Sequence, residues 1–430
     1  MLSKVEKLLP ETYRERLFSP TETLSMFLSQ AMNEDRSCQK IVNEMAVKRA
    51  LEGRPLCSTG TGGYCQARQR LPTEMVSELA RHTGQLIDNQ IPSEWRWKGK
   101  RVRLIDGTTV TLPDTKANQA AYPQPSTQKP GAGYPIVRVV GIISLSSGAL
   151  LNSAMSQCSG KGTGEQALLR SMLDTFSAGD LVLGDALFGD YFLLTSLQEA
   201  GVDAVFEQMG ARKLTTDFRK GKRLGTKDHL MSLPKPKRKP DWMEADKYNS
   251  LPDRLIIREL SVGGKTLITT LLCPKAFPKH ALKSLYKDRW HVEVDLRNIK
   301  TTLGMETLTC QTPEMIKKEM WVYFMAYNLI RLLMAQSALL ANFLPRQLSF
   351  KHTTQLWVAW CQQSQGISAD HKNEEILFIL IAQKRVGNRP DRLEPRVVKR
   401  RPKAFPRLME PRSKARERVS MYGHQKKTGA

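Results

Sequence analysis

Three acidic residues have the chemistry of a divalent-metal site. Asp106 follows the apolar run in VRLIDGTT, and Asp185 follows the apolar run in DLVLGDALF. Glu293 lies further along the chain, in the helical segment LYKDRWHVEVDLRNIKTTL at 285–303. Carboxylate oxygens are the ligands that Mg²⁺ and Mn²⁺ prefer, and two such ions about 4 Å apart can activate an attacking hydroxyl and stabilise the leaving oxygen of a phosphodiester. These residue types therefore suit metal-dependent phosphoryl transfer.

Each aspartate also has an ordinary structural interpretation. Asp-Gly is a frequent turn sequence, which explains Asp106 equally well, and Asp185 is a suitable N-cap for the segment that follows it. An acid at the end of a buried strand nevertheless lies where the edge of an α/β sheet opens into a ligand crevice. Taken alone, the two aspartates leave both interpretations open.

A row of polar side chains borders the apolar stripe of the helix that carries Glu293. On a helical wheel, Arg289, Glu293 and Lys300 fall within about 60° of Tyr286. Cationic side chains there could hold phosphates beside a metal site, but such a row can equally be an amphipathic rim whose charged ends reach water. The wheel places Asp295 on the opposite side, near 180°, and predicts that it is solvated.

The elements around these residues predict a mixed α/β fold. Helical spacing dominates the start of the chain, strand-like alternation begins near residue 100, and helices then alternate with strands. A basic proline-rich run, LPKPKRKPDW, precedes two β-rich runs around a Gly-Gly turn, which indicates a β-rich insertion. The predicted regions are a helical N-terminal region (1–95), the first part of the α/β domain (96–206), the insertion (207–280), the second part with the Glu helix (281–340), a helical C-terminal region (341–390) and a basic, extended or partly disordered tail (391–430).

The composition favours a polyanionic partner. The 430 residues carry a formal net charge of +24, which would steer the protein to nucleic acid, although a merely basic protein is the alternative. No apolar run reaches the roughly 18 residues of a membrane span, and the N-terminus lacks a signal-peptide core. The seven cysteines form no CxxC pair and are interpreted as reduced thiols of a cytoplasmic protein.

The glycine-rich stretch SGKGTGE at 159–165 is not a nucleotide-binding loop. A Walker A motif needs Ser or Thr after its lysine, whereas Gly162 follows Lys161 here. Lys161 could instead approach DNA from this loop. Small N-terminal helices joined by tight loops also suit binding of a DNA end, and they equally suit a plain helical bundle.

Several motifs together resemble one large group of bacterial transposases, the insertion-sequence-four family. YKDRWHVEVDLRNIK fits the signature Tyr-x2-Arg-x3-Glu-x6-Lys without a gap, LIDGTTVTLP is similar to the family's first acidic motif, and LVLGDALFGDYFLL is similar to its second. The similarity runs from about residue 95 to 335, and the region ending in EPRVVKRRPKAFPRL also resembles the end of family members. Many relatives have Arg after the second Asp, whereas this chain has Ala186, which puts a DNA contact there in doubt.

The resemblance implies a ribonuclease-H-like core interrupted by a β-rich insertion between the second Asp and the Glu. Asp106, Asp185 and Glu293 would bind two Mg²⁺ ions, or Mn²⁺ in their place. Family members cut the transposon ends by hydrolysis and then use the freed 3′-hydroxyl to attack DNA, in some cases through a hairpin intermediate with a flipped base.

The resemblance also implies DNA contacts. Tyr286, Arg289 and Lys300 would carry the family's phosphate-contact roles. For an aromatic residue that stacks on a flipped base, Trp242 beside the basic run is the first candidate and Tyr248 the second. An aromatic residue of a small β-rich region is more often part of its core.

The sequence therefore predicts a cut-and-paste DNA transposase that acts on double-stranded transposon ends and target DNA. Two protomers would hold the two ends in a homodimeric synapse, in the cytoplasm and at the nucleoid. One alternative is an inactive or repurposed DNA-binding protein, which would need only the basic surface. Another is a ribonuclease-H-like nuclease that cuts without joining, which residue chemistry alone does not separate from a transposase.

Overall fold

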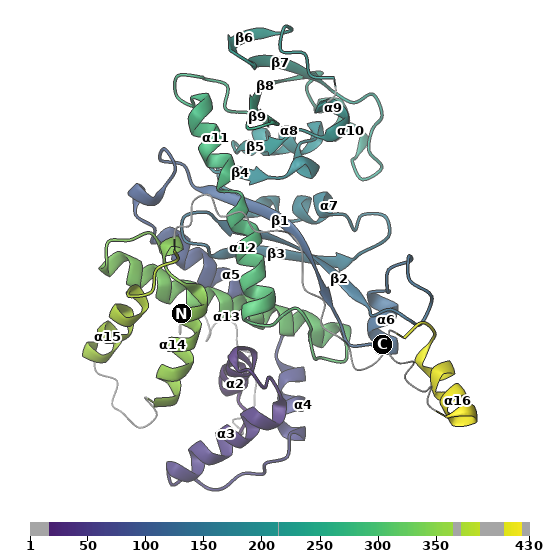
Figure 1. The fold of residues 1–430 in the computed structure, drawn as a ribbon, viewed down its shortest axis with the longest axis vertical. Helices are drawn as coiled ribbons and strands as arrows, with labels where there is room; N and C mark the ends of the chain where they lie inside the picture. Colours follow the sequence, from purple (N-terminus) through teal and green to yellow (C-terminus); the bar gives the residue numbers. More distant parts are fainter. Residues whose placement is uncertain (1–16, 214, 364–370, 388–407, 424–430) are drawn as a thin grey trace, which may run out of the picture.

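The computed structural model describes residues 17–213, 215–363, 371–387 and 408–423. In these residues nine strands form one sheet, in the order β3-β2-β1-β4-β5-β9-β8-β7-β6 (Figure 1). The strands are β1 Val102–Thr111, β2 Ile136–Ser144, β3 Leu150–Gln157, β4 Leu181–Gly184, β5 Asp203–Glu207, β6 Lys222–Gly225, β7 Asp228–Pro234, β8 Arg254–Val262 and β9 Lys265–Thr269. The predicted mixed α/β fold is confirmed.

The sheet has a mixed topology. β1, β2 and β3 form an antiparallel meander, and β4 and β5 add in parallel on the other side of β1. The four strands within 207–280 continue the same sheet, because β9 pairs antiparallel with β5. These strands, with α9 (Gly210–Lys213) and α10 (Ala245–Ser250), form the upper end of the molecule in Figure 1.

The helices cover both faces of the sheet and extend one end of the molecule. They are α2 Pro20–Met32, α3 Cys38–Leu51, α4 Gly62–Arg70, α5 Thr73–Asn89, α6 Lys116–Ala121, α7 Glu165–Arg170, α8 Tyr191–Glu199, α11 Lys279–Lys287, α12 Trp290–Arg297, α13 Pro313–Leu340, α14 Phe350–Gln363, α15 His371–Ala382 and α16 Arg412–Tyr422. Several begin with the expected signals: the Asp190 carboxylate caps α8, and Thr312 caps α13, which has Pro313 at its first position.

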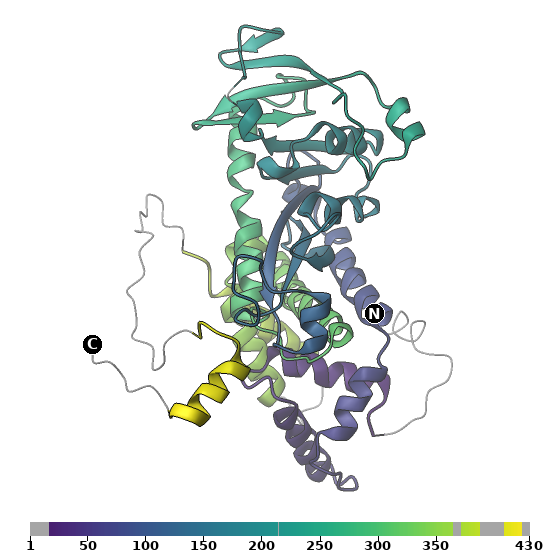
Figure 2. The same ribbon diagram turned by 90° about the vertical axis from the view of Figure 1, so that its right-hand side faces the viewer.

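Alternate residues of the central strands face two different apolar cores. Leu104 of β1 packs in the core formed with α5, α11, α12 and α13, whereas its neighbour Ile105 packs in the core formed with α7 and α8. Figure 2 shows α11 and α12, in green, as a long rod beside the sheet. One face of the sheet is therefore covered by α11 and α12, and the other by α7 and α8.

α5 packs closely against β3 and α13. A Cβ at Gly84 would lie 2.1 Å from the Leu150 carbonyl oxygen, so only glycine permits this approach of helix to strand. The Asn328 side chain of α13 accepts a hydrogen bond from Leu150 N–H and donates to the carbonyl oxygens of Leu150 and Ala80. One buried amide therefore ties α5, α13 and β3 together, while α2, α3 and α4 lie at the end of the molecule opposite β6–β9 (Figure 1).

The tail was predicted to be extended or partly disordered, and part of it is helical instead. Arg412–Tyr422 form α16, and a Cβ at Gly131 would lie 3.1 Å from the Pro411 ring that precedes this helix. The segment RSKARERVSMY is mostly polar, with only Ala415, Val419 and Tyr422 at helical spacing, so its apolar signal for a helix is weak, although Lys, Arg, Ala and Glu favour helix locally. Residues 388–407, with nearly all of the motif EPRVVKRRPKAFPRL, lie outside the described residues. Among the helices that are described, none is long and apolar enough to cross a membrane.

Candidate active site

Asp106 lies in the middle of β1, neither at a strand end nor in a turn. β1 runs unbroken over ten residues, and Asp106 pairs with Gly141 of β2. The predicted turn at Asp-Gly is wrong because β2 supplies partners along nearly all of β1. On the other side, the parallel pairing with β4 ends at Leu104 and Leu183, so the two strands diverge there. Continuing this register by two residues places Asp106 level with Asp185.

Asp185 directly follows β4 and begins the short helix η3 (Ala186–Phe188). Its Oδ1 accepts a hydrogen bond from Leu187 N–H at 2.8 Å, so the predicted capping role is real. Oδ2 accepts no hydrogen bond from any residue that the structure describes, and it stays available for another partner. A Cβ at Gly184 would lie 2.9 Å from side-chain atoms of Ile105 and Phe188, so glycine lets the end of β4 sit close to β1.

The segment that carries Glu293 is nearly one continuous helix. α11 ends at Lys287 and α12 begins at Trp290, but the backbone of Asp288 and Arg289 stays right-handed helical, with φ of −69° and −51°. After Arg297 the helix widens into a π-type turn, η4 (Asn298–Thr302). The helix angles used in the sequence prediction therefore hold approximately up to this turn.

Arg289 lies between two of the three predicted metal ligands. Its Nη2 donates to Glu293 Oε1 at 2.8 Å, and its Nη1 is 4.0 Å from Asp106 Oδ2. The side chains of Arg289 and Asp106 are only 17% and 18% exposed, so the rim interpretation is wrong for Arg289. The guanidinium places a positive charge where the carboxylates of β1 and α12 converge.

The other two members of the polar row also face the sheet. Lys300 Nζ donates to Thr108 Oγ1 of β1 at 3.2 Å, two residues beyond Asp106. The Tyr286 hydroxyl, which is buried, donates to the Gly184 carbonyl oxygen at 3.4 Å, next to Asp185. The row therefore borders the middle of β1, which carries Asp106, and the end of β4, which Asp185 follows.

The surroundings disfavour the ionised form of Asp106. Burial raises the pKa of its carboxyl from 3.8 to about 6, even though Gly107 N–H donates to it at 2.8 Å and the Arg289 guanidinium lowers the pKa. The negative charges of Asp185 and Glu165 raise the pKa of Asp106 further. The site is therefore short of positive charge.

We expect Asp106→Asn to stabilise the metal-free protein above about pH 6, by about 1–3 kcal/mol. The folded protein holds the Asp106 proton more tightly than the unfolded chain, because the pKa of about 6 lies above 3.8. The contribution of Asp106 to folding stability therefore increases as the pH falls through about 6. At neutral pH the ionised Asp106 carboxylate destabilises the folded state. Asparagine resembles the protonated acid, so its advantage should disappear below about pH 4. Thermal unfolding of Asp106→Asn and the parent in EDTA, at neutral pH and below about pH 4, measures the difference in stability. An Asp106→Asn protein that is less stable than the parent at neutral pH would contradict the prediction.

A fourth carboxylate, which the sequence prediction missed, lies against β1. Glu165 is the first residue of α7, and a Cβ at Gly107 would lie 2.2 Å from its carboxyl carbon. The one feature of the sequence that could have indicated Glu165 is its position directly after the glycine-rich loop 159–164. Such a residue is ordinary at a helix N-terminus, so the sequence alone gave no reason to place it beside Asp106.

Asp295 is buried, contrary to its predicted exposure. It is 0% exposed and accepts hydrogen bonds from Arg331 of α13 and from Arg346 Nη2, the latter at 2.8 Å. Arg346 belongs to η5 (Pro345–Gln347). A wheel of one helix cannot show that α13 and η5 cover its second side.

The oxygen-rich donor set suits a hard divalent cation. Among the described residues, no three Asp, Glu, His or Cys side chains are already close enough together to hold an ion. The Arg289 guanidinium lies between the carboxylates of Asp106 and Glu293, in the place that a metal ion would take. The residues fit a metal provided that Arg289 leaves Glu293 when the ion binds.

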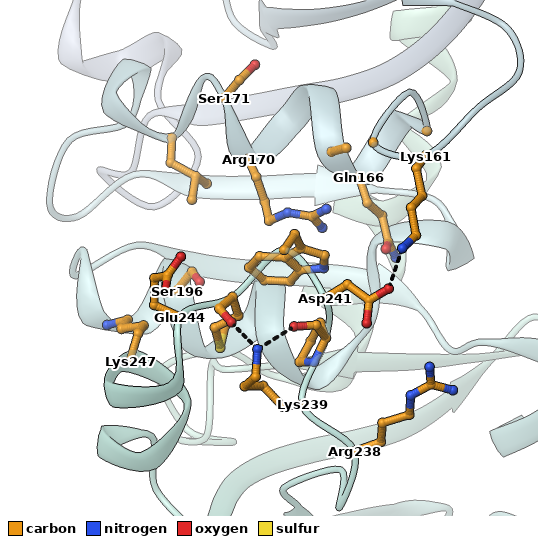
Figure 3. A pocket seen from close by; sticks show the side chains of 17 residues that line it. Lys161, Gln166, Arg170, Ser171, Ser196, Arg238, Lys239, Asp241, Glu244 and Lys247 are labelled. Atoms are coloured by element: carbon orange, nitrogen blue, oxygen red, sulfur yellow. Dashed lines mark hydrogen bonds and ion pairs between the residues drawn. The ribbon is translucent and has the colours of Figure 1, made fainter.

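Lys161 and Trp242 lie together, on one cavity of about 1230 Å³ between the glycine-rich loop, α7 and the segment 238–247 (Figure 3). Lys161 Nζ pairs with the Asp241 carboxylate at 2.7 Å, and Trp242 is 47% exposed. In Figure 3 the Arg170 side chain points into the cavity from α7, and its guanidinium lies 3.9 Å from the centroid of the Trp242 ring. Gly164 and Gln166, the sequence neighbours of Glu165, also line the cavity, which therefore reaches the start of α7.

Tyr248 is less available than Trp242 for stacking. Its hydroxyl donates to the carbonyl oxygens of Pro236 and Lys237, and its ring contacts Phe192 and Lys235. These contacts hold the ring within the segment that follows β7.

Two aspartates beside the point where β1 and β4 diverge, with a glutamate and an arginine from a facing helix, form an arrangement typical of the DDE class of phosphoryl-transfer enzymes. Residues 97–329 match the family model described as "Transposase DDE domain", which covers more than half of the chain. The chain belongs to this family, as its motifs predicted.

Two relatives agree with this family. Over 406 residues the chain is 29% identical to "Transposase InsG for insertion sequence element IS4" of Escherichia coli (strain K12), spanning 92% of this chain and 88% of that protein. Over 137 residues it is 31% identical to "Putative transposase InsZ" of the same strain, which is 32% of this chain and 45% of that protein. The protein is therefore an insertion-sequence-four-family DDE transposase, a DNA-cleaving and strand-transferring enzyme.

A solved structure of the piggyBac transposase synaptic complex with hairpin DNA aligns with 90% of this chain and 82% of its own, at 10% identity. Its TM-score is 0.44.

Proposed function

We propose that this transposase excises and reinserts its element by metal-dependent hydrolysis and strand transfer at terminal inverted repeats, with Asp106, Asp185 and Glu293 as metal ligands. The observation that carries the proposal is the Arg289 guanidinium between Asp106 and Glu293, because it marks a place where the fold holds a cation among acids. Divalent ions bound there, Mg²⁺ or Mn²⁺, would activate the attacking hydroxyl and stabilise the leaving oxygen.

The division of the chain that we propose follows the sheet. β1–β5 with α5, α7, α8, α12 and α13 form a ribonuclease-H-like core, in which an antiparallel meander adjoins two parallel strands. Residues 207–280 are an insertion that extends this sheet beyond β5, and the helices before residue 95 bind the transposon end. The net charge of +24 and the basic segment 235–239, which follows β7, support a DNA-binding surface on the insertion.

The residues of the polar row take separate roles in this mechanism. Arg289 pairs with Glu293 and lies near Asp106 in the metal-free protein, and with an ion bound its guanidinium would be free to contact a phosphate. Lys300, held beside β1 by Thr108, contributes a point charge to the adjoining phosphate. The Tyr286 hydroxyl fixes the Gly184 carbonyl and so the turn that presents Asp185.

The cavity of Lys161 and Trp242 is a proposed DNA contact beside the carboxylates. Five cationic and two acidic side chains line it, so the lining is net positive; they are Lys161, Arg170, Arg238, Lys239, Lys247, Asp241 and Glu244. Arg170 covers one face of the Trp242 ring and the Phe192 ring lies nearly perpendicular to it, with centroids 6.0 Å apart, but Trp242 is still 47% exposed and so offers part of its ring to a base. Trp242→Ala is expected to reduce binding of end DNA that carries an unpaired base more than binding of a plain duplex, measured by competition; equal losses would count against stacking.

Incubation of the protein with DNA that carries the element's terminal repeats, in Mg²⁺ or Mn²⁺, tests the proposed function. We expect nicked or double-cut ends, and strand-transfer products in which the freed 3′ end is joined to target DNA. Cutting without joining would instead support the nuclease alternative, and binding without cutting would support an inactive DNA-binding protein. Sedimentation of the end complex checks for two protomers on two ends; one protomer in an active complex would contradict the homodimer.

We expect Arg289→Ala and Lys300→Ala each to weaken the complex with end DNA, because each removes a proposed phosphate contact. Each should also reduce the slope of log K against log salt concentration by about one. Arg297→Ala is the matched control, since Arg297 lies on the same helix but is exposed. Affinities measured by fluorescence anisotropy at several salt concentrations decide this. If Arg289→Ala and Lys300→Ala behave like Arg297→Ala, the clamp assignment is wrong.

A further inference from the structure

The site residues on β1 divide between the two faces of the sheet. Strand alternation puts Asp106 and Thr108 on the face of Leu104, where α12 and η4 lie, and the contacts with Arg289 and Lys300 agree. Gly107 faces the other side, with Ile105, towards α7. A group that approaches the site from α7 therefore meets β1 at Gly107.

Gly107 leaves room for one such group, the carboxylate of Glu165. A Cβ at Gly107 would lie 2.2 Å from Glu165 Cδ, 2.4 Å from Oε1 and 2.7 Å from Oε2. Real Cβ atoms do not approach other atoms so closely, so any other residue at this position would push the carboxylate away. The φ of Gly107 is not positive, so the backbone does not require glycine here, and a side chain at this position would instead displace the Glu165 carboxylate.

Among the described residues, no cationic side chain forms an ion pair with the Glu165 carboxylate. In the described part of the chain neither oxygen accepts a hydrogen bond or forms an ion pair, and the nearby Arg138 donates instead to the Thr163 carbonyl at 2.8 Å. Burial and the charge of Asp185 raise the pKa of Glu165, while Arg138 lowers it. A half-buried carboxylate beside other carboxylates is costly unless a cation joins them.

We propose that Glu165 is a fourth ligand of the metal site, supplied from α7 across Gly107 and directed to the ion on the Asp185 side. This inference rests on the proposed metal site. Gln166, the residue after Glu165, donates a hydrogen bond to the Leu187 carbonyl oxygen in the short helix that Asp185 begins, so the start of α7 lies beside the turn that carries Asp185. Glu293 and Arg289 then serve the α12 side, and Glu165 serves the α7 side.

Binding of Mn²⁺ alone, without DNA, tests the inference. Free Mn²⁺ is measured by electron paramagnetic resonance during titration of the parent, Glu165→Gln and Asp106→Asn, with Glu94→Gln as an exposed control. We expect Glu165→Gln to weaken binding about 10- to 100-fold, as loss of an ordered oxygen partner does at metal sites. Thermal unfolding in EDTA should show Glu165→Gln to be at least as stable as the parent, because repulsion is relieved.

The outcomes separate the inference from the site on which it rests. If Asp106→Asn weakens Mn²⁺ binding and Glu165→Gln does not, the inference about Glu165 is wrong and the three-carboxylate site stands. If neither variant differs from the parent, the metal site itself is wrong. A Glu165→Gln protein that melts lower in EDTA but binds Mn²⁺ normally has lost only a structural contact, which also overturns the inference.

Gly107→Ala gives a second variant that keeps the Glu165 charge but displaces it. We expect it to weaken Mn²⁺ binding about as much as Glu165→Gln, and the double variant to lose no more than either single one, because both act through the same carboxylate. Additive losses, or normal binding by Gly107→Ala, would overturn the proposal.

Discussion

Replacing Glu293 with glutamine is expected to abolish strand cleavage, a loss of at least about 10³-fold, while binding of terminal-repeat DNA stays nearly unchanged. Glutamine keeps the length of the side chain and an oxygen that accepts from Arg289. It removes the charge that a divalent ion requires, and metal-assisted displacement loses several kcal/mol of transition-state stabilisation with it. Binding of the duplex depends on cationic side chains elsewhere, so it should survive.

Cleavage and binding must be measured on the same preparation for this result to be decisive. Single-turnover cutting of a labelled end in Mg²⁺ gives the rate, and anisotropy in Ca²⁺ gives the affinity. Glu306→Gln is the matched control, because Glu306 lies just beyond η4 and is exposed. A Glu293→Gln protein that still cuts would show that another residue completes the site, and the assignment of Glu293 would be wrong.

Much of the sheet and of the helix face could be predicted from the sequence because the signals there are local. The buried run before Asp185, the β8–β9 hairpin around Gly263-Gly264 and the cap of α8 each act within a few residues. The polar row was also visible, because Arg289 and Glu293 are one helical turn apart and so share a face.

The rest depended on contacts between distant segments, which a local pattern does not contain. The local sequence Asp106-Gly107 predicts a turn, but in the fold β2 pairs along this part of β1. That pairing depends on residues about thirty positions later in the chain. Glu165 reads as an ordinary first-turn acid until Gly107, far from it in sequence, provides the space for its carboxylate. Asp295 shows the same limit: a wheel gives the angle of a side chain but not which face of the helix another helix covers.

Replacing Asp295 with alanine is expected to destabilise the protein by about 3–5 kcal/mol, the largest stability effect that we predict. Its carboxylate is fully buried and binds Arg331, which is also buried, and Arg346 at 2.8 Å. Alanine would leave two guanidinium groups with no carboxylate in a site closed to water. Thermal unfolding in EDTA, with exposed Asp246→Ala as control, should show a clear fall in Tm for Asp295→Ala alone.

The same residue connects stability to the site, because Asp295 lies on α12 two residues after Glu293. Its ion pairs hold α12 against α13 and η5, on the side away from β1. An apolar triple variant, Asp295→Leu with Arg331→Met and Arg346→Met, leaves no buried charge unpaired and should recover part of the lost stability. If the triple variant melts with the parent but cuts DNA slowly, the ion pairs serve to set the position of Glu293. If Asp295→Ala melts with the parent, the buried pairing described here is wrong.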